Sequence, residues 1–393
     1  MIPLPARFSY TTIALFCFGL PLFAQTETTA TPPPEPPCKV QGPIENWDAA
    51  AQLIAGANAT NYAGTFAPDQ KAAWDDYAKT ATRDWRNLKY RYVDRIAAWR
   101  SKHLPKNTSI DTVFYPFSGP DATNPLAFFP EAKDYTLVGL EPVGCVPSNT
   151  ANYSPEYWPA LRKGWQSAVA LGFFKTEEME HDLAEGSAGG VLPVLLFLIA
   201  RAGNTIVDVT PIAIAPNGNI TAPNDAVKTE TNGVMIHFRT TQVVNSKTKA
   251  SANPGPVRTL RYFALNLTNT RLRRKPGTTK YLQTLPAQAT LVKSASYLMH
   301  KRYFSDIRGT ILSKSNVVIE DDSGIPYHYF EPNNWDVHLF GAYDKPIDLF
   351  KNWLQDDLKA AYDAKENVQP LDFGISYKFR LGESNLLLAM RKK

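Results

Sequence analysis

The chain has 393 residues, of which 44% are hydrophobic, and carries a formal net charge of +5 at pH 7. This length supports one large or two smaller domains, and the high Trp and Tyr content fits a large core or saccharide-facing surfaces. Positive and negative charges are interspersed, and one short basic cluster, Arg271–Lys275, comes with no recognition module. We therefore expect no nucleic-acid binding.

Residues 1–24 have the order of a secretory signal peptide. A charge at Arg7 precedes an apolar run from about Ile13 to Phe23, and the small residue Ala24 comes before a polar stretch. This order predicts export and cleavage, with a mature protein in the periplasm or outside the cell and no remaining transmembrane span. Leu22 stands where cleavage prefers a small residue, so an uncleaved anchor is the alternative. The run is short for a bilayer span of roughly 20 residues, which favours cleavage.

Residues 25–40 are predicted to be a proline-rich tether. The proline density of Thr31–Pro37 excludes a helix or a paired strand and indicates an extended polyproline segment. Such a segment would hold a folded domain away from whatever the N-terminus meets.

Three cysteines occur in the chain. Cys17 lies in the apolar run and is lost on cleavage, and its neighbour Phe16 is too bulky for the small residue expected before a lipidated cysteine. Cys38 and Cys145 remain after cleavage. In an oxidising compartment they can pair with each other, and two separate thiols are the alternative.

Residues 41–110 are predicted to form an N-terminal helical segment. After Pro68, apolar residues recur at steps of three and four with Asp, Lys and Arg between them, which places them on one helical face. The pattern predicts a long helix whose aromatic stripe packs across the rest of the protein. The stripe consists of Trp74, Tyr77, Ala81, Trp85, Leu88, Tyr92, Ile96 and Trp99.

Residues 111–393 are predicted to form an α/β body. It opens with a strand at Thr112–Phe117, a break at Ser118–Asp121, a short helix at Pro125–Ala132 and a second strand at Tyr135–Leu140. Strands that are apolar on both faces suit a parallel sheet covered on both sides. We expect these two strands to be parallel neighbours.

The next predicted elements are helices at Pro155–Leu171, Glu177–Ala184 and Val191–Ala202, and a strand at Ile206–Ala215. Val191–Ala202 is almost wholly apolar but too short to span a membrane, so we expect a buried helix that ends at Gly203.

The residue pattern changes at about 216–290, and we predict that this region is a β-rich insertion. Val234–Thr241 and Thr259–Thr268 alternate in polarity like antiparallel strands.

The final third is predicted to mix helices and strands and to close with an antiparallel hairpin. The predicted helices are Leu291–His300, Phe304–Ser313 and one through Ile347–Tyr362; the strands are Val317–Glu320, Asp336–Tyr343, Phe373–Phe379 and Ser384–Met390. Together the elements predict a Rossmann-like, mostly parallel α/β sheet with N-terminal helices, a β-rich insertion and a C-terminal antiparallel hairpin.

Most familiar catalytic signatures are absent from the sequence. It has no Walker loop, HExxH, CxxC or GxSxG motif, and its six histidines form no pair at metal-binding spacing. This excludes several large enzyme classes but not enzymes in general, and it leaves any cofactor or metal unspecified.

The first candidate site combines the loop Tyr115–Asp121 with Glu141. In an open α/β sheet, ligands lie beyond the carboxyl ends of the strands, and Asp121 and Glu141 each follow a predicted strand. We predict both as catalytic carboxylates, with Tyr115 and Ser118 as substrate-binding residues. The alternative is a shaped turn in which Asp121 caps a helix.

The same layout resembles half of a class I methyltransferase or another Rossmann-like fold. An acidic residue about 20 positions after a strand–loop–helix turn is where nucleotide-binding folds hold a ribose. The loop, however, has a single glycine, and Pro120 has no N–H to give to a phosphate. An exported protein also lacks ready access to S-adenosylmethionine, so we do not assign that cofactor.

The second candidate site is the acidic segment Glu320–Phe330. Asp321 and Asp322 are predicted as catalytic, because adjacent carboxylates repel and one can keep its proton as a general acid. Tyr327 and His328 are predicted to bind substrate. A hard cation such as Ca²⁺ or an ordinary turn are the alternatives.

The third candidate site pairs His300 with Arg308 as substrate-binding residues. His300 ends a predicted helix, where the dipole favours the cationic imidazolium, and Arg308 offers a bidentate partner for a carboxylate. A structural role for the histidine is the alternative.

Several segments together resemble a family of uncharacterised exported bacterial proteins, and the likeness covers most of the mature chain. They are Tyr115–Asp121, Gly139–Gly144, Ala295–His300, Asp321–Tyr327 and Ser384–Ala389. That family has no assigned activity, so the resemblance implies location in the bacterial envelope and no particular chemistry.

Two functional hypotheses follow. One is a hydrolase or related enzyme that acts on envelope or extracellular material through the carboxylates of Asp121, Glu141, Asp321 and Asp322. The other is a non-catalytic module that binds a small molecule or an envelope component on a degenerate Rossmann-like fold. Convergence of the acidic segments at one sheet edge would favour the enzyme.

Overall fold

A computed structural model describes most of the chain that follows the predicted tether. The described residues are 43–62, 64–105, 110–171, 190–223, 229–240, 255–365 and 368–392, with backbone alone for 167–171. They all belong to one compact unit, Glu35–Lys393. The predicted signal peptide (1–24), the tether (25–40) and the predicted helix Glu177–Ala184 lie outside the described residues.

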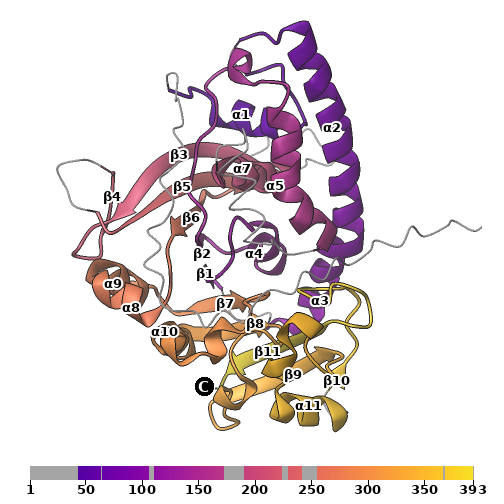
Figure 1. Cartoon of the computed structure of the whole chain (residues 1–393), viewed down its shortest axis with the longest axis vertical. Coiled ribbons are helices and arrows are strands. Elements are labelled where there is room, and N and C mark those ends of the chain that lie inside the picture. The colour runs from indigo at the N-terminus through magenta and orange to yellow at the C-terminus, as the bar shows by residue number, and fades with distance from the viewer. Residues whose placement is uncertain are drawn as a thin grey trace, which may run out of the picture. The chain divides into compact units, whose positions relative to one another are not determined.

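The described part of the chain contains one sheet of eleven strands. Their bounds are β1 Thr112–Tyr115, β2 Asp134–Gly139, β3 Asn204–Ile214, β4 Ile220–Thr221, β5 Thr231–Thr240, β6 Arg258–Ala264, β7 Gln288–Val292, β8 Ser315–Glu320, β9 Trp335–Gly341, β10 Val368–Gln369 and β11 Asn385–Arg391. Across the sheet the strands follow the order β10-β9-β11-β8-β7-β1-β2-β6-β5-β3-β4 (Figure 1).

The centre of the sheet is a block of five parallel strands, β8-β7-β1-β2-β6. The expected parallel pairing of the first two strands is confirmed, with Thr112 opposite Asp134. From β1 the chain builds outward to β2 and β6, and it later returns to add β7 and β8 on the other side. The order therefore reverses between β1 and β7, which makes this a topological switch point.

The sheet as a whole is mixed, so the expectation of a mostly parallel sheet is wrong. Half of the pairs of neighbouring strands are antiparallel, and these pairs contain most of the paired residues. The longest pairing joins β3 to β5. Among the described residues, the connection between β3 and β5 contains the short strand β4 and no crossover helix. Without a crossover, consecutive neighbouring strands pair antiparallel.

The predicted C-terminal hairpin is also wrong. Within 373–379 the structure has a single isolated bridge, between Ile375 and Lys378. The last strand, β11, instead lies between β8 and β9 and is antiparallel to both. Because it has a partner on each edge and a covered layer on each face, its residues 385–389 are all buried.

The region 216–290 is not a separate insertion. It contains β4, β5 and β6, and β5 pairs antiparallel with β6 as expected. However, β6 also pairs in parallel with β2, which makes it a central strand. The described part of the region also contains two helices that the sequence did not predict, α8 Asn269–Arg274 and α9 Pro276–Thr284.

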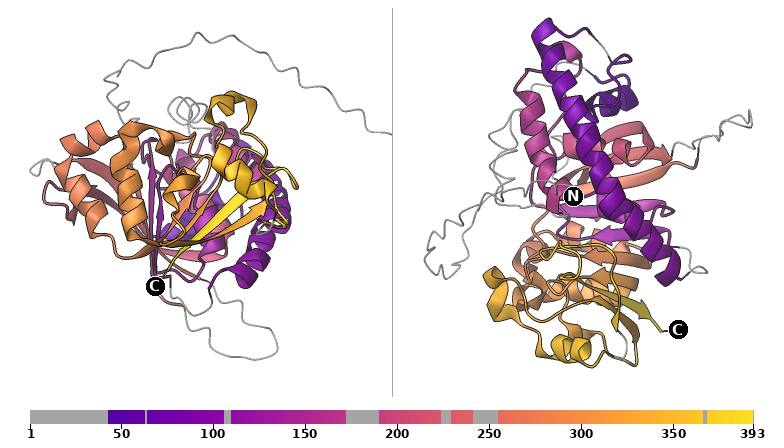
Figure 2. Two further views of the ribbon diagram at one scale, coloured as in Figure 1. Left: turned by 90° about the horizontal axis from the view of Figure 1, so that it is seen from below. Right: turned by 90° about the vertical axis from the view of Figure 1, so that its right-hand side faces the viewer.

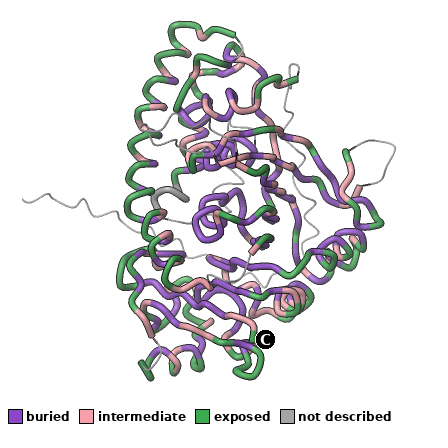
Figure 3. Tube along the Cα trace, turned by 180° about the vertical axis from the view of Figure 1, so that it is seen from behind, coloured by how far each residue is buried: buried purple, intermediate pink, exposed green. Residues whose placement is uncertain are grey.

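The remaining helices cover the sheet. They are α1 Trp47–Ile54, α2 Pro68–Leu88, α3 Asp94–His103, α4 Thr123–Phe128, α5 Tyr157–Leu171, α7 Leu192–Arg201, α10 Ser305–Lys314 and α11 Asp356–Asp363. A π-helical turn, Lys89–Val93, joins α2 to α3. Figure 3 shows the central strands buried and the outer side of α2 exposed.

The long N-terminal helix is confirmed. α2, the π-helical turn and α3 run continuously from Pro68 to His103, and every residue of the predicted aromatic stripe is buried. Trp85 contacts Phe197 of α7 edge-on, and Trp99 contacts Phe340 of β9 at a ring-centroid distance of 5.0 Å. The helix therefore crosses the body from one part of the sheet to the other (Figure 2).

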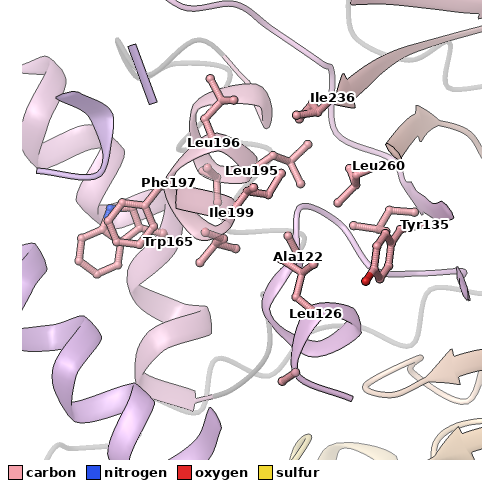
Figure 4. Close-up of a cluster of buried hydrophobic side chains, with 14 of the residues drawn as sticks. Ala122, Leu126, Tyr135, Trp165, Leu195, Leu196, Phe197, Ile199, Ile236 and Leu260 are labelled. Carbon is pink, nitrogen blue, oxygen red and sulfur yellow. The ribbon is translucent and has the colours of Figure 1, made fainter. Parts of the chain in front are cut away.

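The apolar segment after Gly190 is the buried helix α7, as predicted. Its side chains meet those of β5 and β6, and the ring of Phe197 stacks on Trp165 at 4.6 Å (Figure 4). Gly203 follows in a left-handed conformation with φ +83°. In the part of the chain that the structure describes, no helix is both long enough and apolar enough to cross a membrane.

The predictions for the final third are partly confirmed. The expected α10, β8 and β9 are present, but the predicted helix Leu291–His300 is wrong. Its first residues end β7, and a 3₁₀ turn at Leu298–His300 follows a loop with left-handed residues. The predicted helix through Ile347–Tyr362 is split into a 3₁₀ segment, Asp348–Trp353, and α11.

Candidate functional site

The carboxyl ends of β1, β2, β6 and β7 surround a cavity of about 120 Å³ at the switch point, here called the crevice. Parallel strands end at the same edge, so the four following loops converge there. The crevice is lined by Phe117 and Gly119 after β1, by Val138–Glu141 of β2 and its loop, by Leu265–Leu267 after β6, and by Ser294–Ser296, Leu298 and Phe304 after β7.

The loop after β1 turns sharply beneath the crevice. Phe117 and Gly119 both have left-handed backbone, with φ of 58° and 51°. The backbone N–H of Ser118 donates to the Val138 carbonyl at 2.8 Å, and the Ser118 hydroxyl bonds to the carbonyls of Val138 and Gly119. Ser118 therefore shapes the loop and does not face the crevice, although the sequence predicted it to bind substrate.

Glu141 presents a buried carboxylate to the crevice. A Cβ atom on Gly139 would lie 2.5 Å from Glu141 Oε2, and one on Gly119 would lie 3.4 Å from Oε1, so the carboxylate rests over two glycines. Oε2 accepts from the Leu140 N–H at 3.0 Å and from the Tyr262 hydroxyl at 3.2 Å. Of the predicted site residues, only Glu141 lines the crevice.

Asp121 forms a buried ion pair with Lys293. The Lys293 Nζ lies 3.3 Å from Asp121 Oδ2, and the two side chains are 4% and 3% exposed. Oδ2 also accepts from the Tyr115 hydroxyl at 2.9 Å and from Asn124 Nδ2 at 2.6 Å. Burial and then the nearby Asp121 raise the pKa of Tyr115 well above its usual value, so its phenol stays a neutral donor.

The Asn124 N–H donates to Asp121 Oδ1 at 3.2 Å, near the start of α4. Asp121 stands one residue before the N-cap Ala122, so it bonds to the first turn of α4 without being the cap that the sequence left open as the alternative. Donors therefore reach both oxygens of this carboxylate, and Asp121 and Tyr115 stabilise the loop beneath the crevice.

Asp321 joins the loops after β7 and β8. Its carboxylate accepts from the Ser294 N–H at 3.1 Å, from the Ser323 N–H at 3.1 Å and from the Ser323 hydroxyl at 2.6 Å. Asp121 and Glu141 thus lie at one sheet edge, as expected from parallel strands, and Asp321 joins them because β8 runs parallel to β7. Asp121, however, is bonded to Lys293 and Tyr115, and Asp321 is bonded to Ser294 and Ser323. Neither carboxylate lines the crevice.

Asp322 bonds to a different part of the protein. Its carboxylate accepts from Asn385 Nδ2 at 2.8 Å and from the Tyr297 hydroxyl, while its N–H donates to Asn385 Oδ1 at 2.7 Å. Burial is the largest cause that raises the Asp322 pKa to about 6, and the charge of Asp321 adds to it. The preceding Glu320 is also buried, which raises its pKa well above the usual value.

The acidic residues of this edge do not form a metal cage. Among the described residues, no group of three or more His, Cys, Asp or Glu side chains is arranged to hold a metal ion.

His300 and Arg308 lie apart from the crevice lining. Burial is the main cause that lowers the His300 pKa to about 4, so the expected cationic imidazolium is wrong. The predicted helix whose dipole would have favoured the cation is absent. Arg308 Nη1 donates to the Met299 carbonyl at 2.5 Å, and its guanidinium lies 4.4 Å from the Tyr329 ring centroid, so it is engaged within the protein.

Tyr327 and His328 also lie outside the crevice lining. They belong to a 3₁₀ turn, Tyr327–Tyr329, whose first N–H donates to Gln355 Oε1 at 2.8 Å. His328 is largely exposed, and its Nδ1 lies 3.8 Å from Asp357 Oδ2.

Sequence reasoning missed Lys293, Asn124 and Tyr262. Lys293 was predicted to lie in the helix Leu291–His300. Its position directly after the apolar run Ala289–Val292 was the one signal that could have marked it as a residue at a strand end. Tyr262 carries no sequence signal, because it lies 121 residues from its partner Glu141. Asn124 lies only three residues after Asp121, so the helix-cap alternative for Asp121 could have marked it.

Comparison of the chain with protein-family models, with curated proteins and with solved structures found no match in any of the three. The function is therefore inferred from the arrangement of these residues.

Replacing Lys293 by Met should lower the free energy of unfolding by about 3–5 kcal/mol, because Asp121 is left buried without its counter-charge. The double variant Asp121→Asn/Lys293→Met should recover part of that loss. Urea denaturation measures both. Lys71→Met is the matched control: it breaks a half-exposed ion pair with Asp75 and should cost less than about 1 kcal/mol. A Lys293→Met variant as stable as this control would show that the buried pair does not stabilise the fold.

The raised pKa of Asp322 makes stability depend on pH. Its folded value of about 6 exceeds the ordinary 3.8, so between these values the folded state binds more protons than the unfolded state. The contribution of Asp322 to stability is therefore full below about pH 4 and declines as pH rises through 6. Relative to Asp322→Asn, the wild type should lose on the order of 1–3 kcal/mol between pH 4 and pH 7 in urea denaturation. Parallel stability curves for the two proteins would contradict the assignment.

Proposed function

We propose that this protein is a non-catalytic binding module that holds a small hydroxyl-bearing molecule in the crevice of a Rossmann-like body. The observation that carries the proposal is the buried Glu141 carboxylate, which faces the crevice from the end of the second strand. Carboxylate oxygens accept hydrogen bonds from hydroxyl groups, and Glu141 lies beside a glycine turn at the switch point.

The strand order supports the Rossmann-like assignment. If the parallel strands are numbered in chain order, the block β6-β2-β1-β7-β8 reads 3-2-1-4-5, the order of dinucleotide-binding folds. In those folds an acidic residue near the end of the second strand accepts ribose hydroxyls. The layout resembles that of a class I methyltransferase, and the ligand class that fits is a nucleoside or another vicinal diol.

The crevice limits the size of that ligand. Its volume of about 120 Å³ is well below the roughly 300–1,000 Å³ of pockets that enclose a whole drug-sized ligand. Pro120 has no N–H for a phosphate, so a dinucleotide is a poor fit. A single sugar or nucleoside moiety is the better match.

The carboxylate bonds argue against the hydrolase hypothesis. Asp121, Asp321 and Asp322 accept from donors of the protein itself, and none of the three lines the crevice. A general acid or base must reach the reacting proton directly or through one water. Of the four predicted catalytic carboxylates, only Glu141 lines the crevice, and one carboxylate does not make a catalytic pair.

Isothermal titration calorimetry with adenosine and 2′,3′-dideoxyadenosine tests the proposal. Adenosine should bind at least about tenfold more tightly, because each hydroxyl bonded to a carboxylate contributes roughly 1.5–3 kcal/mol. Glu141→Gln should remove most of this preference, and Asn266→Trp, at the exposed rim of the crevice, should block binding. Glu131→Gln and Thr270→Trp, at exposed positions outside the crevice lining, are the matched controls. Absence of binding by adenosine and by ribose, or an unchanged preference in Glu141→Gln, would refute the proposal.

We also propose that the protein is exported to the bacterial envelope. Cys145 is disulfide-bonded, and the chain's other cysteines, Cys17 and Cys38, lie outside the described residues. Structural disulfides persist in oxidising compartments such as the periplasm. This supports the same location as the signal-like order of residues 1–24.

Non-reducing mass spectrometry of the protein from its native host should yield a disulfide-linked peptide that contains Cys38 and Cys145. The N-terminus of the mature chain should lie between Gln25 and Thr31. The pairing follows because Cys17 is removed with the signal peptide. Reduction before digestion should release the two peptides separately. An intact Met1 in a soluble cytosolic pool, or two alkylatable thiols in the native protein, would overturn the proposal.

A further inference from the structure

A second and larger cavity lies where the long N-terminal helix meets the C-terminal segment. Its volume is about 340 Å³, within the range of ligand pockets, and it shares no lining residue with the crevice. One wall is the π-helical turn Lys89–Val93 with the adjoining turns of α2 and α3; the other is the segment 372–381 before β11. We call it the groove; Figure 1 shows α3 beside that C-terminal segment.

The π-helical turn shapes the inner wall of the groove. Such turns widen the helix locally and occur frequently at functional sites. Here Tyr92 points inward, where its hydroxyl donates to Asn124 Oδ1 at 2.6 Å and its ring meets Phe373 edge-on at 5.9 Å. Both rings are buried, so the groove has a fixed aromatic floor.

The rim of the groove exposes large apolar side chains. Tyr90 and Leu381 are each 70% exposed, and Phe379 is 36% exposed. Exposed apolar side chains are unremarkable when scattered, but a contiguous group around a cavity marks a binding surface. A ligand in this groove would therefore carry a flat or compact apolar body.

The charged side chains of the groove are predominantly cationic. Arg91 and Arg95 line it together with one acid, Asp372. The Arg95 guanidinium lies 5.9 Å from the Tyr90 ring centroid, and it has no carboxylate partner among the described residues. A guanidinium held over an aromatic face can still pair with a carboxylate or phosphate through its N–H groups.

We infer that the groove is a second binding site, for a small organic anion whose flat apolar body lies between Tyr90 and Phe379 and whose anionic group pairs with Arg95. The size, the aromatic walls and the cationic rim all select this class. The inference is independent of the ligand proposed for the crevice, because no lining residue is shared. Tyr92 in the floor of the groove bonds to Asn124, and Asn124 bonds to Asp121 in the loop beneath the crevice.

Titration of the full chain with 2-naphthoate, followed by protein NMR or ligand fluorescence, tests the inference. The neutral amide 2-naphthamide has the same ring system without the charge. The naphthoate should bind at one site and at least about tenfold more tightly than the amide, as expected for one charge-assisted hydrogen-bonded pair. Arg95→Gln should abolish that difference, whereas Tyr90→Ala should weaken both ligands.

The chain supplies matched controls. Tyr303 is 43% exposed with the Lys301 ammonium 5.8 Å from its ring centroid, yet it lines neither the groove nor the crevice. Tyr303→Ala and Lys301→Gln should leave naphthoate binding unchanged, and so should Asn266→Trp at the crevice. Thermal unfolding checks that each variant is folded. Equal binding of naphthoate and naphthamide, or naphthoate affinity unchanged in Arg95→Gln and Tyr90→Ala, would overturn the inference.

Discussion

The buried ion pair of Lys293 and Asp121 is the constraint on which the crevice depends. Two charges removed from water require a close partner and further hydrogen bonds, and Tyr115 and Asn124 supply those bonds to Asp121. The pair fixes the loop after β1 to the end of β7, on the two sides of the switch point. Tyr92 extends the network to the long N-terminal helix through Asn124.

This constraint explains why the acids gathered at one sheet edge do not all face the crevice. Asp121 is neutralised by Lys293, and Asp321 is bonded to the Ser294 and Ser323 donors that fix the neighbouring turns. Glu141, one strand further along, differs because it borders a cavity. A carboxylate thus serves as a structural acceptor at Asp121 and Asp321 and as the candidate ligand acceptor at Glu141.

Backbone strain is concentrated at the same edge. Phe117, Ser294, Ser296 and Tyr297 all have φ between 50° and 58°, a conformation that costs non-glycine residues roughly 1–3 kcal/mol each. Specific bonds hold these turns: Ser296 N–H donates to the Tyr377 hydroxyl at 3.1 Å, and Tyr297 N–H to the Ser323 carbonyl at 3.2 Å. Such strain persists where surrounding structure enforces it, which is typical of loops that shape a site.

The sequence alone determined the local elements with strong periodicity and the common sheet edge of Asp121 and Glu141. The stripe from Trp74 to Trp99 predicted the long helix, because a helix buried on one face has apolar residues every three or four positions. The apolar run after Gly190 predicted α7, because a helix buried on all faces is apolar throughout. The parallel pairing of β1 and β2 also followed from their apolar faces. Only the tertiary structure decided the position of β11, the role of β6 and the partners of each carboxylate. Those depend on contacts between residues far apart in the chain, such as Asp121 with Lys293, for which neither periodicity nor spacing carries a signal.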